Sequence, residues 1–273
     1  MTDIRKFFPS SGTQAVDGAC LRARDGSIHA LVGENGAGKT TLMRILYGLE
    51  RADSGKIEVD GREARITGTA DARALGIGMV QQHFTTVDDF TVAENIALGG
   101  EPRAFGLFYG RREAEARAAR TLRAHGFALD PRAKAGTLPV GGRQLLEIAK
   151  LLHRDARILI LDEPTAVLAE REIDALFDTL RALRDSGRTV ILITHKVREV
   201  MRIADQVSVM RAGKTTDTLP ISETGEDDLS CRIMGVSACP SPGGRTPSRA
   251  RGDTVLRAEA LVAARADGRG NAL

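Results

Sequence analysis

The sequence predicts an α/β fold with a mostly parallel sheet and helices on both faces. Short apolar runs typical of buried strands alternate with segments in which apolar residues recur at helical spacing. The first of these runs ends in a glycine-rich turn that leads directly into a helical segment. Such alternation is typical of parallel sheets covered on both faces.

The predicted elements follow one another from the N-terminal end. Buried strands are predicted at residues 27–32, 158–161 and 189–194, and helices at residues 42–49, 111–125, 145–152 and 173–183. Gly126 and Gly187 are the expected stops of two of these helices. The chain has 273 residues, enough for one large core with an appendage.

Composition excludes several classes of function. The 39 basic and 36 acidic residues nearly balance, and aromatic residues are few, so neither charge nor stacking favours a nucleic-acid partner. No apolar stretch approaches the ~20 residues that span a bilayer, and no CxxC pair suggests a zinc site.

The glycine-rich turn, GENGAGKT at residues 33–40, fits the phosphate-loop pattern GxxxxGK[ST]. Its glycines let backbone N–H groups turn toward a phosphate, and the following helix presents its positive end to the anion. Lys39 supplies a charge for the β/γ oxygens and Thr40 a hydroxyl for Mg²⁺. A chance glycine-rich turn is the alternative, and the flanking strand and helix argue against it.

Two adjacent carboxylates, Asp162 and Glu163, follow the predicted strand at 158–161. The carboxyl ends of parallel strands form the ligand-binding edge of such a sheet. There Asp162 can orient Mg²⁺ and Glu163 can polarise an attacking water. Alone, the pair could equally be a solvated turn before Pro164, so its functional interpretation depends on the phosphate loop.

These motifs, with three further segments, resemble the ATP-binding domains of ABC transporters over about residues 4–235. The segment MVQQHF at residues 79–84 is similar to the family's Q-loop, with Gln82 at its glutamine. His195 matches the switch histidine, and Phe8 matches the aromatic residue that stacks on adenine. Any one of these side chains alone would more often be structural or solvated. Their common order carries the resemblance.

The resemblance implies a P-loop NTPase fold: a RecA-like, mostly parallel sheet, an inserted α-helical subdomain at about residues 84–150, and an N-terminal antiparallel β element. Residues 1–236 are expected to form the ATPase domain, without the family's usual first strand before Ile4. Residues 237–253 have a Pro/Gly-rich linker composition. Residues 254–273 are expected to begin a truncated second ATPase domain.

The resemblance also implies ATP and Mg²⁺ as cofactors. Lys39, Glu163 and His195 are the expected catalytic residues: Lys39 stabilises phosphoryl charge, Glu163 orients water and His195 senses the γ-phosphate. Thr40, Gln82 and Asp162 are expected to hold Mg²⁺. The expected nucleotide contacts are Phe8, Gly33, Asn35, Gly36, Ala37, Gly38, Lys39, Thr40, Thr41 and Gln82.

The family signature LSGGQ, which serves the ATP bound on the opposing domain, is altered here to Leu138-Pro139-Val140-Gly141-Gly142. Pro139 has neither a backbone N–H nor a hydroxyl, so it cannot donate to a γ-phosphate. The change is expected to weaken the partner's site and leave this chain's own site complete. Ala169 replaces the aspartate of the D-loop, which is expected to loosen communication between the two sites.

Within the family, residues 45–49, 80–84, 91–99 and 194–196 look like the nucleoside and simple-sugar import group, and His83-Phe84 favours the nucleoside branch. Membership implies transmembrane permeases, a second ATPase domain (a tandem copy or a homodimer partner) and a substrate-binding lipoprotein reached through the permeases. It implies a peripheral place on the cytoplasmic face of the inner membrane and no nucleic-acid partner.

Three other functions are alternatives to the importer. A DNA-acting P-loop ATPase would show zinc-pattern cysteines or long heptad arms, and neither is present. A translation factor of paired ABC domains would tend to keep an intact signature and a charged helical linker. A truncated fragment that binds ATP without turnover stays open, because the sequence stops as the second copy begins.

Overall fold

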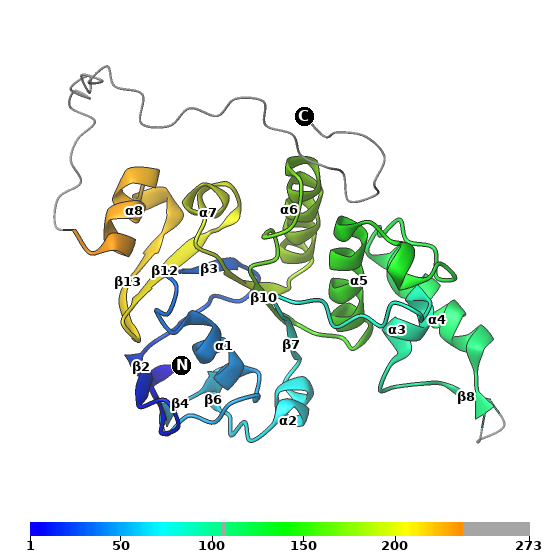
Figure 1. Ribbon diagram of the computed structural model, residues 1–273, viewed down its shortest axis with the longest axis horizontal. Coiled ribbons are helices and arrows are strands. Elements are labelled where there is room, and N and C mark those ends of the chain that lie inside the picture. The colour runs from blue at the N-terminus through cyan, green and yellow to red at the C-terminus, as the bar shows by residue number, and fades with distance from the viewer. Residues whose placement is uncertain (105–107, 237–273) are drawn as a thin grey trace, which may run out of the picture. The chain divides into compact units, whose positions relative to one another are not determined.

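The structure is a computed structural model that describes residues 1–104 and 108–236 (Figure 1). The expected linker at 237–253 and the expected second domain at 254–273 lie outside the described residues. The central sheet has the strand order β13-β12-β3-β11-β10-β7, parallel except for β13. These strands are β3 (Ile28–Val32), β7 (Ile77–Val80), β10 (Ile158–Asp162), β11 (Thr189–Ile193), β12 (Gln206–Arg211) and β13 (Lys214–Pro220).

The predicted α/β class is confirmed. The predicted strands correspond to β3, β10 and β11, whose residues are buried except for the first of β10. The predicted helices correspond to α1 (Lys39–Leu46), α4 (Arg111–Ala124), α5 (Val140–His153) and α6 (Glu170–Asp185). Strands covered on both faces lack polar alternation, which is why continuous apolar runs marked them in the sequence.

A smaller antiparallel sheet, formed by strands from the N-terminal part of the chain, has the order β2-β1-β4. It contains β1 (Thr2–Phe8), β2 (Thr13–Ala19) and β4 (Ser54–Lys56). The expected antiparallel element is therefore present. Strand β1 begins at Thr2, runs through Ile4 and pairs with strands on both sides. Two short hairpins, β5 (Glu58–Val59) with β6 (Arg62–Glu63) and β8 (Arg103–Ala104) with β9 (Phe108–Tyr109), complete the strands.

Helices cover both faces of the central sheet, as Figure 1 shows for α1 and α6. Successive side chains of a strand point to opposite faces. Ile160 of β10 thus belongs to one core with α1 and the antiparallel sheet, whereas Leu159 belongs to another with α5 and α6. A third core lies under α7 (Val197–Ile203) and α8 (Glu226–Met234). Helix α2 (Thr69–Ala74) packs beside β7.

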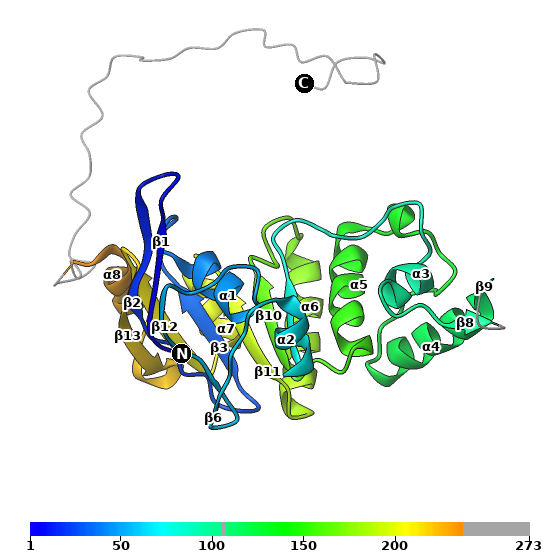
Figure 2. The same ribbon diagram turned by 90° about the horizontal axis from the view of Figure 1, so that it is seen from below.

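An α-helical unit is inserted between β7 and β10, and Figure 2 shows its helices beside the sheet domain. Helix α3 (Val92–Ala97) packs on α4 and α5. Thr91 and Glu94 form a capping box that starts α3. The buried amide of Asn95 exchanges hydrogen bonds with the backbone of Val87, which ties the preceding loop to the unit. Among the described residues, no helix is long and apolar enough to cross a membrane.

A buried histidine lies in the centre of the sheet. His29 of β3 has no exposed surface; its Nε2 lies 2.8 Å from Ser208 Oγ on β12, and its Nδ1 has no protein partner. Burial lowers the pKa of His29 from 6.5 to about 4. The cause is loss of hydration, which disfavours the charged form.

This burial predicts an acid-sensitive contribution to stability. The unfolded chain takes up the His29 proton near pH 6.5 and the folded chain only near pH 4, so stability is lost as pH falls through that interval. Between pH 7 and pH 5 the free energy of unfolding should fall by about 2 kcal/mol more in the wild type than in His29→Asn. Urea unfolding at both pH values measures this. Equal losses in the two proteins would contradict it.

Candidate functional site

The phosphate loop lies at the carboxyl end of β3 and leads into α1. The Lys39 side chain is buried here, and its Nζ donates to the carbonyl oxygens of Gly33 at 2.7 Å and Glu34 at 2.9 Å. Burial lowers the pKa of Lys39, while the charges of Glu163 and Asp162 act to raise it. The ammonium is therefore held inside the loop, where an anionic phosphate would meet it.

Two glycines of the loop are required by close backbone packing. A Cβ on Gly33 would lie 2.1 Å from the carbonyl oxygen of Met210 in β12, and one on Gly38 would lie 2.3 Å from that of Ala15 in β2. Both also have positive φ, of 154° and 97°. Strands of both sheets therefore lie close against the loop at these two glycines.

The loop and the acidic pair meet at Thr40 and Asp162. The Thr40 hydroxyl donates to Asp162 Oδ1 at 3.4 Å, across 122 residues of sequence. Asp162 is buried, and burial is the main cause that raises the pKa of its carboxyl, opposed by the Thr40 hydrogen bond and the Lys39 charge. A buried carboxylate beside a hydroxyl is a hard oxygen donor set.

Glu163 lies between two of the predicted side chains. Its Oε1 is 2.9 Å from Nδ1 of His195, and its Oε2 accepts a hydrogen bond from Nε2 of Gln82 at 3.4 Å. Glu163 adopts φ = 48°, a left-handed conformation that costs a non-glycine residue about 1–2 kcal/mol. Strain of this kind persists only where the surroundings impose it, and it clusters at functional sites.

Strand register explains why these residues converge. Strands β10 and β11 pair in parallel, with Asp162 beside Ile193. The backbone N–H of Glu163 continues the ladder by donating to the Ile193 carbonyl at 2.9 Å. Glu163 and His195 therefore leave adjacent strands at the same edge of the sheet. The structure brings Lys39, Thr40, Gln82, Asp162, Glu163 and His195 together, as the sequence predicted.

Several predicted nucleotide contacts are placed without a contact that tests them. Asn35 and Gly36 are exposed on the outer turn of the loop, Ala37 is buried, and Thr41 is half-buried in the first turn of α1. Phe8 ends β1, pairs with Thr13 and has the Lys6 ammonium 5.4 Å above its ring. Stacking of Phe8 on adenine stays a prediction.

The donor set suits Mg²⁺ in part. Thr40 and Asp162 offer oxygen atoms at one place. Gln82 donates a hydrogen bond to Glu163, the residue that follows Asp162. Within residues 1–104 and 108–236, no group of three or more His, Cys, Asp or Glu side chains could hold a metal ion. Mg²⁺ typically uses one or two protein ligands and completes its shell with phosphate and water. The residues present therefore fit a nucleotide-bound Mg²⁺ rather than a protein cage.

The altered signature forms the start of α5. Pro139 is the N-cap and makes no side-chain cap hydrogen bond, and Val140, Gly141 and Gly142 form the first turn. The N–H of Gly141 donates to Glu172 Oε1 at 3.0 Å, a contact that the sequence analysis missed. No short-range pattern announces it, because Glu172 lies 31 residues away.

Glu172 also joins this signature to the D-loop position. Its other oxygen, Oε2, accepts the N–H of Ala169 at 2.9 Å, at the N-cap of α6. Alanine has no side-chain acceptor, so this is half of a capping box. One carboxylate therefore holds the first turns of α5 and α6.

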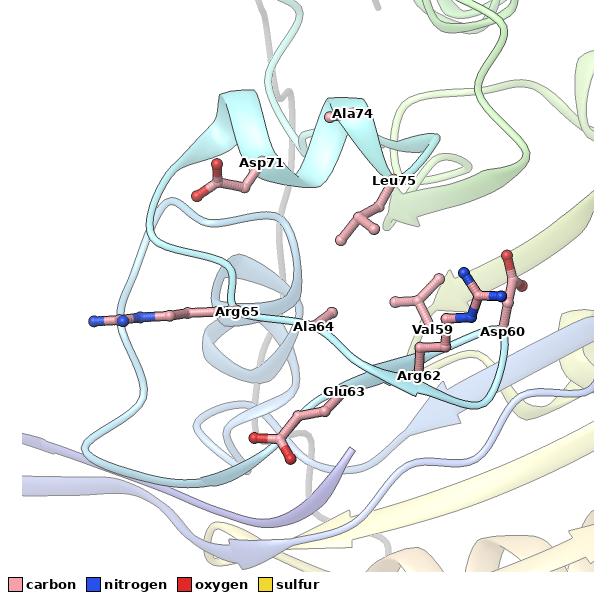
Figure 3. A pocket seen from close by; sticks show the side chains of 9 residues that line it. All are labelled: Val59, Asp60, Arg62, Glu63, Ala64, Arg65, Asp71, Ala74 and Leu75. Atoms are coloured by element: carbon pink, nitrogen blue, oxygen red, sulfur yellow. The ribbon is translucent and has the colours of Figure 1, made fainter.

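A broad cavity of about 690 Å³ lies away from this site, between the β5–β6 hairpin and α2. Figure 3 shows Leu75 pointing toward Val59, whereas Glu63 and Arg65 extend away from both. The lining residues carry mixed charges and include none of the predicted site residues. Convergent polar groups, not cavity size, therefore mark the candidate site.

Comparison with known proteins agrees with this geometry. Residues 16–166, more than half of the chain, match the protein-family model described as ABC transporter. The chain is 46% identical over 234 residues to the ribose import ATP-binding protein RbsA 1 of Streptomyces avermitilis. It is 44% identical over 236 residues to a putative ribose/galactose/methyl galactoside import ATP-binding protein of Burkholderia cenocepacia. These alignments cover 86% of this chain and 44% and 46% of the relatives, so the chain spans about half their length.

Solved structures show the same fold. An ATP-binding cassette of an ABC transporter in its ADP conformation superposes with a TM-score of 0.71 and 25% identity, over 85% of this chain and 93% of that one. A nucleotide-free ATP-binding cassette gives a TM-score of 0.72 at 24% identity, over 87% and 95%. The predicted P-loop, RecA-like architecture is confirmed.

The loop geometry predicts binding of inorganic tripolyphosphate, which carries the phosphate chemistry without adenine. At about one hundred times its dissociation constant it should raise the melting temperature by about 5–10 °C. Lys39→Met should remove most of this shift, because it removes the buried ammonium. Lys134→Met, at an exposed lysine of the helical unit, is the control and should keep it. Equal shifts in both variants would exclude Lys39 from phosphate binding.

Proposed function

The chain belongs to the ABC transporter family, and from that membership we propose that it binds ATP and hydrolyses it to drive an importer of a simple sugar or nucleoside. One observation carries the hydrolytic part. Glu163 lies 2.9 Å from His195 at the sheet edge where Thr40 meets Asp162. A carboxylate so placed, beside a phosphate loop, suits the activation of water for phosphoryl transfer.

The proposed mechanism assigns one task to each group of the chain. Loop amides and Lys39 bind the triphosphate, and the N-terminal end of α1 favours its charge. Glu163 accepts a hydrogen bond from the attacking water and orients it in line with the γ-phosphorus. His195 holds one carboxylate oxygen of Glu163, and Gln82 holds the other. Mg²⁺, held at Thr40 and Asp162 with Gln82 nearby, would neutralise charge on the β- and γ-oxygens.

The partners follow from the same proposal. A second ATPase domain would close on this one. The signature of the second domain would then complete the site at Lys39, and residues 138–142 of this chain would contact the nucleotide bound to the second domain. Gln82 and the helical unit after it would contact permeases at the cytoplasmic face of the inner membrane, and a binding lipoprotein would deliver solute to those permeases. The site is assigned to nucleotide in this proposal, so the permeases and the lipoprotein would select the solute.

The solute class rests on the relatives. Those cited above are named for import of ribose, or of ribose, galactose and methyl galactoside. A simple sugar is therefore the better supported solute. The preference for a nucleoside, drawn from His83-Phe84, stays a prediction.

The carboxylate of Glu163 should be required for hydrolysis. Glu163→Gln keeps the size of the side chain and removes the charge that activates water, so steady-state ATPase activity should fall by about 100-fold or more. ATP affinity should stay within about threefold, because Glu163 does not bind the phosphates in this proposal.

The control is Glu113→Gln, at a half-exposed glutamate of α4 that pairs with Arg117. It should keep wild-type activity. Equal phosphate release by wild type and Glu163→Gln would remove Glu163 from the mechanism. Binding without hydrolysis in every protein would favour the alternative of a fragment that binds ATP without turnover.

Restoring serine in the signature should increase turnover. Pro139→Ser adds a backbone N–H and a hydroxyl at the start of α5, and preorganised donors stabilise developing charge. The kcat for ATP should rise by about two- to tenfold if the signature serves an opposing site. Pro131→Ser, in a loop of the helical unit, is the control. Serine is also a better N-cap, so a raised melting temperature with unchanged kcat would show a capping effect alone.

A further inference from the structure

A closed side-chain network lies directly behind Glu163 and His195. Thr165 follows Glu163 by two residues, Lys196 follows His195 by one, and Glu199 lies in the first turn of α7. The three residues, here called the Thr165–Lys196–Glu199 clamp, join the loop after β10 to the loop after β11. No motif in the sequence analysis assigned a task to them as a group.

Every polar group of the clamp has a partner. The Thr165 hydroxyl donates to Glu199 Oε2 at 2.6 Å. Lys196 Nζ donates to Glu199 Oε1 at 3.0 Å, to the Thr165 carbonyl at 3.1 Å and to the Thr165 hydroxyl oxygen at 3.3 Å. An ammonium has three N–H groups, and three acceptors surround this one. A buried network in which all groups are satisfied is rigid.

Burial makes the clamp sensitive to the loss of one member. Thr165 is 2% exposed and Glu199 is 7% exposed, whereas the Lys196 side chain is 36% exposed. Removal of Lys196 leaves a buried carboxylate without its counter-charge, which is strongly unfavourable. Removal of the Glu199 charge leaves a lysine that water can reach. The two single losses are therefore unequal.

Glu163 and His195 stand beside the clamp residues in the two loops. Glu163 holds a strained left-handed backbone, and the His195 side chain is about half exposed. The Glu163 side chain is 17% exposed. The clamp joins the two loops that carry this pair, at two residues after Glu163 and at one residue after His195.

We propose that Thr165, Lys196 and Glu199 are positioning residues that set the relation between Glu163 and His195 during ATP hydrolysis. This inference rests on the hydrolytic function proposed above. In this proposal the clamp acts through the two loops and not by binding the nucleotide. A displacement of about 1 Å in such a pair can lower a catalytic rate by about 100-fold.

The first test separates rate from binding and from stability. Lys196→Met should lower kcat for ATP by about tenfold or more and change KM by less than about twofold. Lys196→Met with Glu199→Gln removes both charges and leaves at position 199 a neutral amide whose oxygen can still accept the hydrogen bond of the Thr165 hydroxyl. This double variant should recover the wild-type melting temperature, which Lys196→Met lowers, but it should not recover the wild-type kcat. Arg198→Met, at an 88% exposed arginine of the same helix, should match wild type.

Two kinetic outcomes would overturn the inference. If the double variant regains both melting temperature and kcat, the clamp only supports the fold. If Lys196→Met keeps the wild-type kcat, the clamp does not position the pair. Equal activity in wild type and Glu163→Gln would instead contradict the proposed hydrolytic role of Glu163.

The second test does not depend on hydrolysis. The His195 ring signal in a proton NMR spectrum is identified by its loss in His195→Asn. It should change position in Lys196→Met and in the double variant, because the His195–Glu163 hydrogen bond is altered, and stay in place in Arg198→Met. An unchanged signal in all three proteins would overturn the proposal whatever the ATPase rates.

Discussion

The site depends on one backbone hydrogen bond, from the N–H of Glu163 to the carbonyl of Ile193. It extends the β10–β11 ladder by one residue beyond the last paired position. The left-handed backbone of Glu163 then separates the two carboxylates: Asp162 contacts Thr40, and Glu163 contacts His195. A residue in an ordinary extended conformation here would continue the strand. The strain of about 1–2 kcal/mol is thus the cost of giving neighbouring acids different tasks.

Charge balance in the site follows from the same geometry. Burial lowers the pKa of Lys39 and raises that of Asp162, so each loses part of its preference for the charged form. Their mutual attraction opposes both shifts. The amides of the phosphate loop add a positive field to that of the Lys39 ammonium. A triphosphate is favoured there because it brings negative charge to a buried ammonium and to the end of α1.

The sequence predicted the parts of this arrangement whose chemistry is local. The phosphate loop is readable because its glycines and Lys39 stand within eight residues, between a strand and a helix. Asp162 and Glu163 are readable because an apolar run ends at them. The clamp was not readable: Thr165 and Lys196 lie 31 residues apart and meet only because β10 and β11 are neighbours. The contact of Glu172 with Gly141 depends likewise on the packing of two helices. Strand β12 and the edge strand β13 were not predicted, because neither segment gave a sharp local signal. The adenine contact of Phe8 stays a prediction.

The altered signature has different consequences for the two kinds of partner. The segment at 138–142 lacks the donors of a serine at Pro139, and the N–H of Gly141 already donates to Glu172. In a homodimer both nucleotides would face this signature, and both sites would lack those donors. In a pair with a different ATPase domain only one would. The site at Lys39 would then be completed by the other domain's signature and retain its full set of donors. Glu172 also accepts the N–H of Ala169, so the signature and the D-loop position share one carboxylate. A movement of either loop would therefore alter a hydrogen bond of the carboxylate that holds the other.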